Sequence, residues 1–317
     1  MLSLGFDTSN YTTSCAFFDG AGGQNFSRLL DVPEGALGLR QSDALFSHVK
    51  RLPELSDRLF ACLEGEKPDC IGVSTRPRAV EGSYMPCVLA GHSQAQVLGT
   101  ALGIPVVEVS HQQGHIAAAL WSAGRLELLE QPFLAWHLSG GTTELLYVAP
   151  EGRNVACTKL GGTTDISAGQ LIDRTGKLLS LPFPAGKALD RLAQTAEETD
   201  FFRVRVNECE FSLSGVQNQV EKYRQTHENP ADTAAFALRS VVHAVKQATK
   251  NAQKRYPGLP VLCSGGVASN SLLRSRMRDL DAIFAAPEFS TDNAMGCAIL
   301  AQRLADASGQ LKVESER

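Results

Sequence analysis

The chain has 317 residues, of which 43% are hydrophobic, so it is long enough to bury a large core and, by length alone, to form about two domains. Charged residues make up 20% and leave a formal net charge of -4, which excludes a protein-wide basic field, so any RNA contact must be local. The eight cysteines are scattered without a C-x-x-C pair, which indicates neither a zinc ribbon nor a disulfide framework. The start lacks a basic and apolar leader, and no apolar run reaches the roughly 20 residues that span a bilayer, so we expect a cytoplasmic protein without a membrane anchor.

The first third of the chain alternates short apolar strands with helices. Residues 2–7 and 12–18 are predicted to be two strands joined by a polar turn, with the acid Asp7 at the tip of the hairpin. Apolar residues at helical spacing and short buried-type runs predict the elements that follow. Helices are expected over 49–64, 87–102 and 112–121, and strands over 70–74 and 105–109.

The same layout then starts again. Residues 133–148 predict strand, Gly-rich turn and strand, as at the N-terminus. Asn229 is suited to cap a long helix that runs to about Tyr256. A short apolar strand over 260–264 enters a second Gly-Gly turn, and another helix is expected to start near Asn270.

Two successive units of hairpin plus α/β layers are what a duplicated ribonuclease-H-like fold would give. We therefore expect an α/β protein of the actin-like ATPase (ASKHA) fold, with two ribonuclease-H-like lobes and an interlobe nucleotide cleft. The predicted lobes are residues 1–128, which contain a histidine motif, and residues 129–317, which contain the nucleotide-binding loops.

The motif HQQGH, residues 111–115, is a candidate metal site. On a helix, His111 and His115 lie one turn apart on the same face, so their nitrogens can converge on one ion. Two ligands leave a cation under-coordinated, and a carboxylate commonly completes such a set, for which Asp292 in STDNA is the candidate. The alternative is a pair of ordinary histidines.

Two Gly-Gly turns are candidate phosphate sites. The turn in HLSGGTTEL, residues 137–145, lets the backbone approach a phosphate, with hydroxyls of Ser139 or Thr142 beside it. The turn in CSGGVASN, residues 263–270, leads into a helix whose N-terminus favours an anion. Each turn alone is also compatible with a plain tight turn, but together with Asp7 they predict a nucleotide cleft.

Two further features allow both a functional and a plain interpretation. Asp165 and Asp173 are expected on one helix, where their carboxylates meet a ribose or a metal-bound water, or simply lie on an exposed amphipathic face. Lys246, Lys250 and Lys254, four residues apart, form a basic stripe that suits either an RNA backbone or a solvated surface. No nucleophile with a placed base is evident, so no catalytic side chain is assigned.

Together these motifs resemble the TsaD family, the tRNA threonylcarbamoyladenosine transferases once described as O-sialoglycoprotein endopeptidases. The resemblance runs from GFDTS at 5–9 through VSHQQGHI, SGGTTEL, FSLSG and SGGVASN to STDNA. It implies one metal ion, iron or zinc, bound by His111, His115 and Asp292. It also implies that an adenine nucleotide (threonylcarbamoyl-AMP, AMP or ATP) is held by His137, Leu138, Ser139, Gly140, Gly141, Asp173, Gly186, Asp190 and Asn270.

The implied reaction is metal-dependent transfer of the threonylcarbamoyl group from threonylcarbamoyl-AMP to the adenosine beside the anticodon of tRNA. The implied partners are tRNA, a TsaB-like protein and a TsaE-like ATPase. Several family acids are replaced, however: Tyr11 and Thr12 stand for one acidic pair, and Ile166 and Gln170 for two further carboxylates. The alternative is therefore a divergent paralogue, either a carbamoyltransferase or nucleotide hydrolase with another substrate, or a non-catalytic nucleotide-binding partner subunit.

Overall fold

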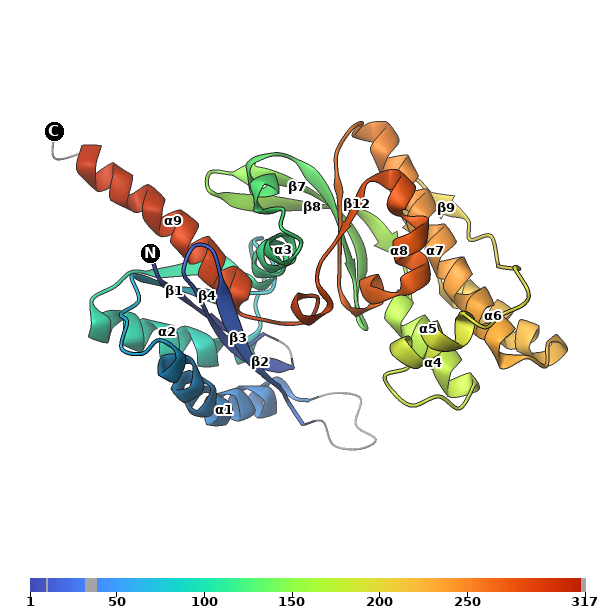
Figure 1. Cartoon of the computed structure of the whole chain (residues 1–317), viewed down its shortest axis with the longest axis horizontal. Helices are drawn as coiled ribbons and strands as arrows, with labels where there is room; N and C mark the ends of the chain where they lie inside the picture. The colour runs from blue at the N-terminus through green and yellow to red at the C-terminus, as the bar shows by residue number, and fades with distance from the viewer. Residues whose placement is uncertain (10, 32–38, 315–317) are drawn as a thin grey trace. The chain divides into compact units, whose positions relative to one another are not determined.

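The computed structural model describes residues 1–9, 11–31 and 39–314, with side chains up to Ala305. The chain divides into two compact units (Figure 1). Unit 1 comprises Met1–Gln131, Ala149–Ala156 and Asp292–Arg317, and unit 2 comprises Pro132–Val148 and Cys157–Thr291. The segment from Asp292 onward thus belongs with the N-terminal residues, whereas the division predicted after residue 128 placed it in the second lobe.

Unit 1 is built on a five-stranded sheet of order β3-β2-β1-β4-β5. The first three strands are antiparallel neighbours, and β4 and β5 run parallel to β1. The predicted hairpin is confirmed, although residue 10 of its turn lies outside the described residues, and β3 is an addition to it. The strands are β1 Ser3–Asp7, β2 Thr12–Phe18, β3 Gly23–Leu29, β4 Cys70–Arg76 and β5 Val106–Ser110.

Helices cover both faces of this sheet. Alternate side chains of β1 point to opposite faces, so each face has its own contacts with the helices. Phe6 packs in one core with α1 and α2. Gly5 faces α9, where a Cβ atom would lie 2.2 Å from the carbonyl oxygen of Ala294, so only glycine lets α9 approach so closely. The helices of unit 1 are α1 Gln41–Cys62, α2 Leu89–Leu102, α3 His111–Ser122 and α9 Met295–Glu314, with short 3-10 turns η1 Pro86–Val88 and η2 Leu126–Glu130.

Helix α1 starts at Gln41, earlier than the predicted residue 49. The missed turns bury Ala44 and a histidine, His48, on the core face. His48 lies within hydrogen-bond distance of the hydroxyl of Thr13 (2.8 Å), so a polar residue occupies a core position that an apolar pattern does not reveal. Among the described residues, no helix is both long enough and apolar enough to cross a bilayer.

Unit 2 is built on a seven-stranded sheet of order β12-β11-β6-β7-β8-β10-β9. The predicted strand, Gly-rich turn and strand form the antiparallel pair β6 and β7, and β11 runs parallel to β6. The shortest strands, with two or three residues each, carry too little pattern to be predicted. The strands are β6 Phe133–Leu138, β7 Thr143–Glu151, β8 Asn154–Thr163, β9 Val206–Asn207, β10 Glu210–Phe211, β11 Val261–Ser264 and β12 Ala282–Phe284.

The long helix α7 organises the core of unit 2. Its predicted cap is confirmed, since the Asn229 side chain accepts a hydrogen bond from the N–H of Ala231 (3.0 Å). The fully buried Trp136 of β6 donates its indole N–H to Thr249 of α7 (2.8 Å), which fixes the helix on the sheet. The helices are α4 Ala168–Leu178, α5 Gly186–Ala193, α6 Ser214–Thr226, α7 Pro230–Arg255 and α8 Ser271–Arg276, with 3-10 turns η3 Gly266–Ser269, η4 Arg278–Leu280 and η5 Pro287–Phe289.

Candidate functional site

The structure brings the three predicted metal ligands together in unit 1. His111 and His115 occupy the first and fifth positions of α3, so they share one helix face. Their Nε2 atoms are 3.0 Å apart, and the Asp292 carboxylate oxygen Oδ1 lies 3.1 Å from His115 Nε2 and 3.5 Å from His111 Nε2. One ligand atom from each residue lies within 4.8 Å of the others, an arrangement that can hold a metal ion.

Local sequence explains why α3 begins at the first histidine. Ser110, the last residue of β5, caps the helix: its hydroxyl accepts from the N–H of Gln113 (3.2 Å), whose side chain accepts in return from the N–H of Ser110 (2.9 Å). This reciprocal capping box satisfies helix donors that would otherwise lack a partner. The strand end therefore fixes His111 directly at the sheet edge.

Close helix packing brings Asp292 to the histidines. Gly114, between the two histidines, faces Gly296 of α9, where a Cβ atom would lie 1.8 Å from the Gly114 carbonyl oxygen. Since no side chain fits at Gly296, the two helices pack backbone to backbone. The segment that leads into α9 then carries Asp292 to the ligand face of α3.

Asp7 contacts the triad, a connection that the sequence did not predict. It ends β1, is only 2% exposed, and accepts a hydrogen bond from His111 Nδ1 at 2.7 Å. Its other oxygen accepts from the N–H of Ser9 and the hydroxyl of Ser74, each at 2.8 Å. A carboxylate can only accept here, so the Nδ1 of His111 carries a proton and donates it to Asp7, while Nε2 points to the ligand face.

The protonation equilibria of the triad follow from these contacts. Burial alone would lower the pKa of His111, but the charge of Asp7 and the hydrogen bonds that the imidazole donates to both carboxylates outweigh it and raise the pKa to about 10. Burial alone would raise the pKa of Asp292, yet its hydrogen bonds with His111 and His115 hold that pKa well below the usual value. The cluster thus binds a positive charge, either protons or a cation.

The donor set fits a transition metal. Two imidazoles and one carboxylate on one face, with the remaining positions open, are the pattern of reactive iron sites and of zinc sites that keep room for substrate. Asp7 supplies the further carboxylate that commonly orients a ligating histidine.

A separate pocket of about 530 Å³ lies within unit 2. Five residues predicted to bind nucleotide line it: Gly140, Asp173, Gly186, Asp190 and Asn270. The other lining residues, of which those at 266–269 belong to the predicted CSGGVASN turn, are Gly169, Ile172, Pro184, Lys187, Gly266, Val267, Ser269 and Pro287. Gly-rich backbone on two sides of this pocket provides the close approach that a phosphate needs.

The remaining predicted nucleotide residues lie in or beside the β6–β7 turn but are not among the pocket-lining residues. His137 and Leu138 end β6, and the N–H and side chain of Ser139 both bond to Thr142, which closes the turn. A Cβ atom at Gly141 would meet nothing within 4 Å, so its backbone is open.

Two pocket carboxylates are held by protein donors. Asp190 accepts from the Asn270 side chain (2.9 Å) and from the N–H and hydroxyl of Ser271 (3.0 and 2.8 Å), which ties α5 to the start of α8. Asp173 accepts from the N–H of Ala185 through Oδ1 (2.8 Å). Among the described residues, no donor reaches its second oxygen, which can therefore accept from a ligand hydroxyl.

Asp165 differs from its prediction, because it precedes α4 and is not on the helix. Its carboxylate accepts from the hydroxyls of Ser212 (2.5 Å) and Ser214 (2.6 Å) and from the N–H of Leu213 (2.8 Å). Burial would raise its pKa, but these hydrogen bonds hold the pKa well below the ordinary value. Asp165 therefore anchors the start of α6, and its oxygens are already used.

The predicted basic stripe is also altered. The Lys246 ammonium lies 2.7 Å and 2.8 Å from the two carboxylate oxygens of Asp279 and 2.7 Å from the carbonyl oxygen of Arg276. It is therefore committed to fixing the segment after α8 on α7, and Lys250 and Lys254 remain at the surface.

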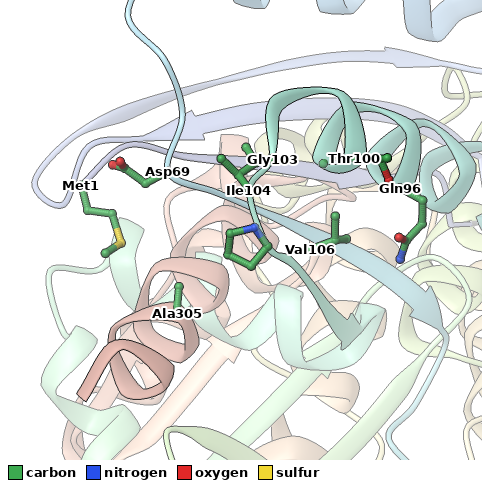
Figure 2. Close-up of a pocket in the computed structure, with 10 residues that line it drawn as sticks. Met1, Asp69, Gln96, Thr100, Gly103, Ile104, Val106 and Ala305 are labelled. Carbon is green, nitrogen blue, oxygen red and sulfur yellow. The ribbon is translucent and has the colours of Figure 1, made fainter. Parts of the chain in front are cut away.

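A further hollow of about 770 Å³ opens in unit 1 (Figure 2). It lies at the beginning of β5, with Pro105 and Val106, whereas His111 follows the end of that strand. Its one carboxylate, Asp69, already accepts from the N–H of Leu2 (2.7 Å). Nothing in its lining converges as the triad does.

Solved structures of the same fold cover almost the whole chain. The HypF protein in its phosphate- and nucleotide-bound form matches with a TM-score of 0.62 at 14% identity over 96% of this chain, which spans only 46% of the HypF chain. The ROK hexokinase of Thermus thermophilus matches with a TM-score of 0.54 at 16% identity, over 97% of this chain and 100% of its own. The chain thus has the actin-like ATPase fold, as predicted.

Sequence relatives define the family within that class. Residues 38–299 match the family described as TsaD, tRNA N6-adenosine threonylcarbamoyltransferase. The protein of that name from Streptococcus suis is 31% identical over 265 residues, 77% of each chain, and one from Streptococcus pneumoniae is 32% identical over 244 residues, 71% of this chain and 70% of its own. The chain belongs to the TsaD family, so the resemblance is confirmed.

Proposed function

We propose that the protein transfers the threonylcarbamoyl group of threonylcarbamoyl-AMP to N6 of the adenosine next to the anticodon of tRNA. The observation that carries this proposal is the family match over residues 38–299 in a chain whose His111, His115 and Asp292 form one converging ligand set. A protein with this reaction is proposed to act in the cytoplasm, where its tRNA substrate is. TsaB-like and TsaE-like proteins are the proposed partners.

The pocket of unit 2 is the proposed site for the AMP part of the donor. Backbone at Gly140 and Gly266 can approach the phosphate, because a Cβ atom at either position would meet nothing within 4 Å. The free oxygen of Asp173 can accept from a ribose hydroxyl. Asp190 and Asn270 hold the pocket wall in place through their mutual hydrogen bond.

The triad is the proposed site of one iron or zinc ion. A metal ion bound by His111, His115 and Asp292 would supply Lewis-acid polarisation of the carbamoyl carbonyl. Asp7 keeps the His111 ring oriented so that its Nε2 faces the ligand position, where a metal ion would displace the Nε2 proton. In the transfer, the adenosine N6 forms a bond to the carbamoyl carbon, the bond from that carbon to the phosphate oxygen breaks, and AMP leaves while N6 loses a proton. No protein nucleophile is required.

At two positions where the family has an acid, the residue of this chain has a structural role that does not require a carboxylate. Gln170 is the third residue of α4 and forms a capping box with Ser167, with reciprocal bonds of 3.0 Å. Gln and Glu serve equally in such a box. Ile166 packs against the core of unit 2. These two replacements therefore do not by themselves argue for a chain that has lost its reaction.

The test is a transfer assay with the purified metal-loaded chain, its proposed partner proteins, threonylcarbamoyl-AMP and unmodified tRNA. Nucleoside analysis by mass spectrometry should detect threonylcarbamoyladenosine with the wild-type chain and none with His115→Ala. Hydrolysis of the donor without modified tRNA would instead support the paralogue alternative.

A further inference from the structure

The segment between α4 and α5 holds one aromatic side chain in solvent. Phe183 is 84% exposed, the largest fraction of any large apolar residue among the described side chains. It stands between Pro182 and Pro184, whose rings restrict the backbone on both sides. A large aromatic ring kept in water on a restricted backbone is available to contact a partner.

Hydrogen bonds fix this segment on α4. The N–H of Leu181 donates to the carbonyl of Gly176 (2.8 Å), and the N–H of Ala185 donates to Asp173 (2.8 Å). Gly176 also lies directly under the segment, since a Cβ atom there would be 2.1 Å from the Cβ of Ala185. The ring of Phe183 is therefore presented from a preorganised loop.

Two cations lie beside this ring. Phe183, Arg174 and Lys177 line a hollow of about 450 Å³, hereafter the Phe183 hollow, whose other lining residues are Asp173, Ser180, Leu181 and Ala185. The Arg174 guanidinium is positioned by Gln217 of α6, which accepts its hydrogen bond at 2.6 Å. Within the described part of the chain, the side-chain ammonium of Lys177 has no hydrogen bond or ion pair. Asp173, the one acid of the lining, already accepts from Ala185.

We infer that the Phe183 hollow binds an unpaired nucleotide of RNA, with the base stacked on Phe183 and the flanking phosphate held by Arg174 and Lys177. Unpaired bases stack on aromatic rings, and cations beside the ring neutralise the backbone. The volume falls within the range of small-ligand sites. That the RNA is the tRNA substrate rests on the proposed function.

The position of the hollow within unit 2 supports a role beside the donor nucleotide. Asp173 lines both the Phe183 hollow and the 530 Å³ pocket, and the neighbouring residues Phe183 and Pro184 line the hollow and the pocket respectively. By contrast, the predicted lysine stripe lacks an aromatic residue in its run and has Lys246 tied to Asp279. The Phe183 hollow therefore replaces that stripe as the first RNA contact to test.

The experiment measures binding of the full-length protein to two labelled probes, unmodified tRNA and a single-stranded oligoadenylate of about a dozen nucleotides. Phe183→Ala should weaken binding by about 5- to 150-fold, the range for loss of one base–aromatic stack, and Phe183→Trp should retain it. Arg174→Gln and Lys177→Gln should each lower the slope of log affinity against log salt by about 0.7. The matched controls, Phe46→Ala and Lys67→Gln, remove an exposed ring and an exposed cation of unit 1 and should change neither quantity.

Equal RNA affinity of wild type and Phe183→Ala would overturn the inference, even if the variant lost contact with a protein partner instead. This result is distinguishable from failure of the proposed function, because the latter is judged by modified adenosine in the wild-type transfer assay. If both proposals hold, Phe183→Ala should raise the KM for tRNA and leave AMP binding unchanged.

Discussion

Asp7→Asn tests how the triad is prepared for a metal ion. The substitution keeps the size of the side chain but replaces the charged carboxylate, which accepts a hydrogen bond from His111 Nδ1 at 2.7 Å, with a neutral amide. Loss of such an orienting carboxylate typically lowers metal affinity by about 10- to 100-fold. That range equals about 1.4–2.7 kcal/mol, which agrees with the roughly 1.5–3 kcal/mol of one hydrogen bond to a charged group.

The assay is a competition titration of Zn²⁺ between the protein and a colorimetric chelator at constant pH. Thermal unfolding of the metal-free protein shows whether the variant is folded. Asp69→Asn is the matched control, because Asp69 is a carboxylate of the same unit that accepts from the N–H of Leu2 and does not touch the triad. Wild-type affinity in Asp7→Asn would refute the assigned role of Asp7.

Three further changes have defined outcomes. The pKa of His111 in the metal-free protein is raised to about 10, so a binding metal ion must displace its proton, and chelator competition should show metal affinity rising about tenfold per pH unit between pH 7 and 9. The same raised pKa stabilises the metal-free fold fully below pH 6.5, and this stabilisation is lost as the pH rises through 10. Gly296→Ala should destabilise the protein by about 1–3 kcal/mol or more in urea unfolding, since its Cβ meets the Gly114 backbone, whereas Gly215→Ala, in open space on α6, should not. Gln170→Ala should cost about 1 kcal/mol through loss of the capping box, and Gln170→Glu should leave both stability and transfer activity near wild type; a large loss in Gln170→Glu would show that the box does not explain this position.

The sequence predicted the parts of the fold that are set by local pattern. The hairpin of β1 and β2, the cap of α7 at Asn229 and the one-turn spacing of His111 and His115 depend on neighbours along the chain. The short strands such as β9 depend on pairing across the sheet, which a two-residue segment does not encode by itself.

The undetected site contacts are long-range for the same reason. Asp7 and His111 are 104 residues apart, and Lys246 finds Asp279 33 residues away, so neither partner is visible in the local sequence. Asp165 was predicted on a helix, but serine donors 47 and 49 residues further on engage it instead. A polar residue that ends a buried strand, such as Asp7, is the signal that could have indicated the missing partner.

The metal content of the purified chain is the most direct test of the triad. Elemental analysis after loading with Fe²⁺ or Zn²⁺ and desalting should give one ion per wild-type chain and none in His115→Ala. X-ray absorption of the loaded wild type should show two imidazole ligands. Equal metal content in both proteins, or a bound ion without imidazole ligation, would contradict a metal centre made by His111, His115 and Asp292.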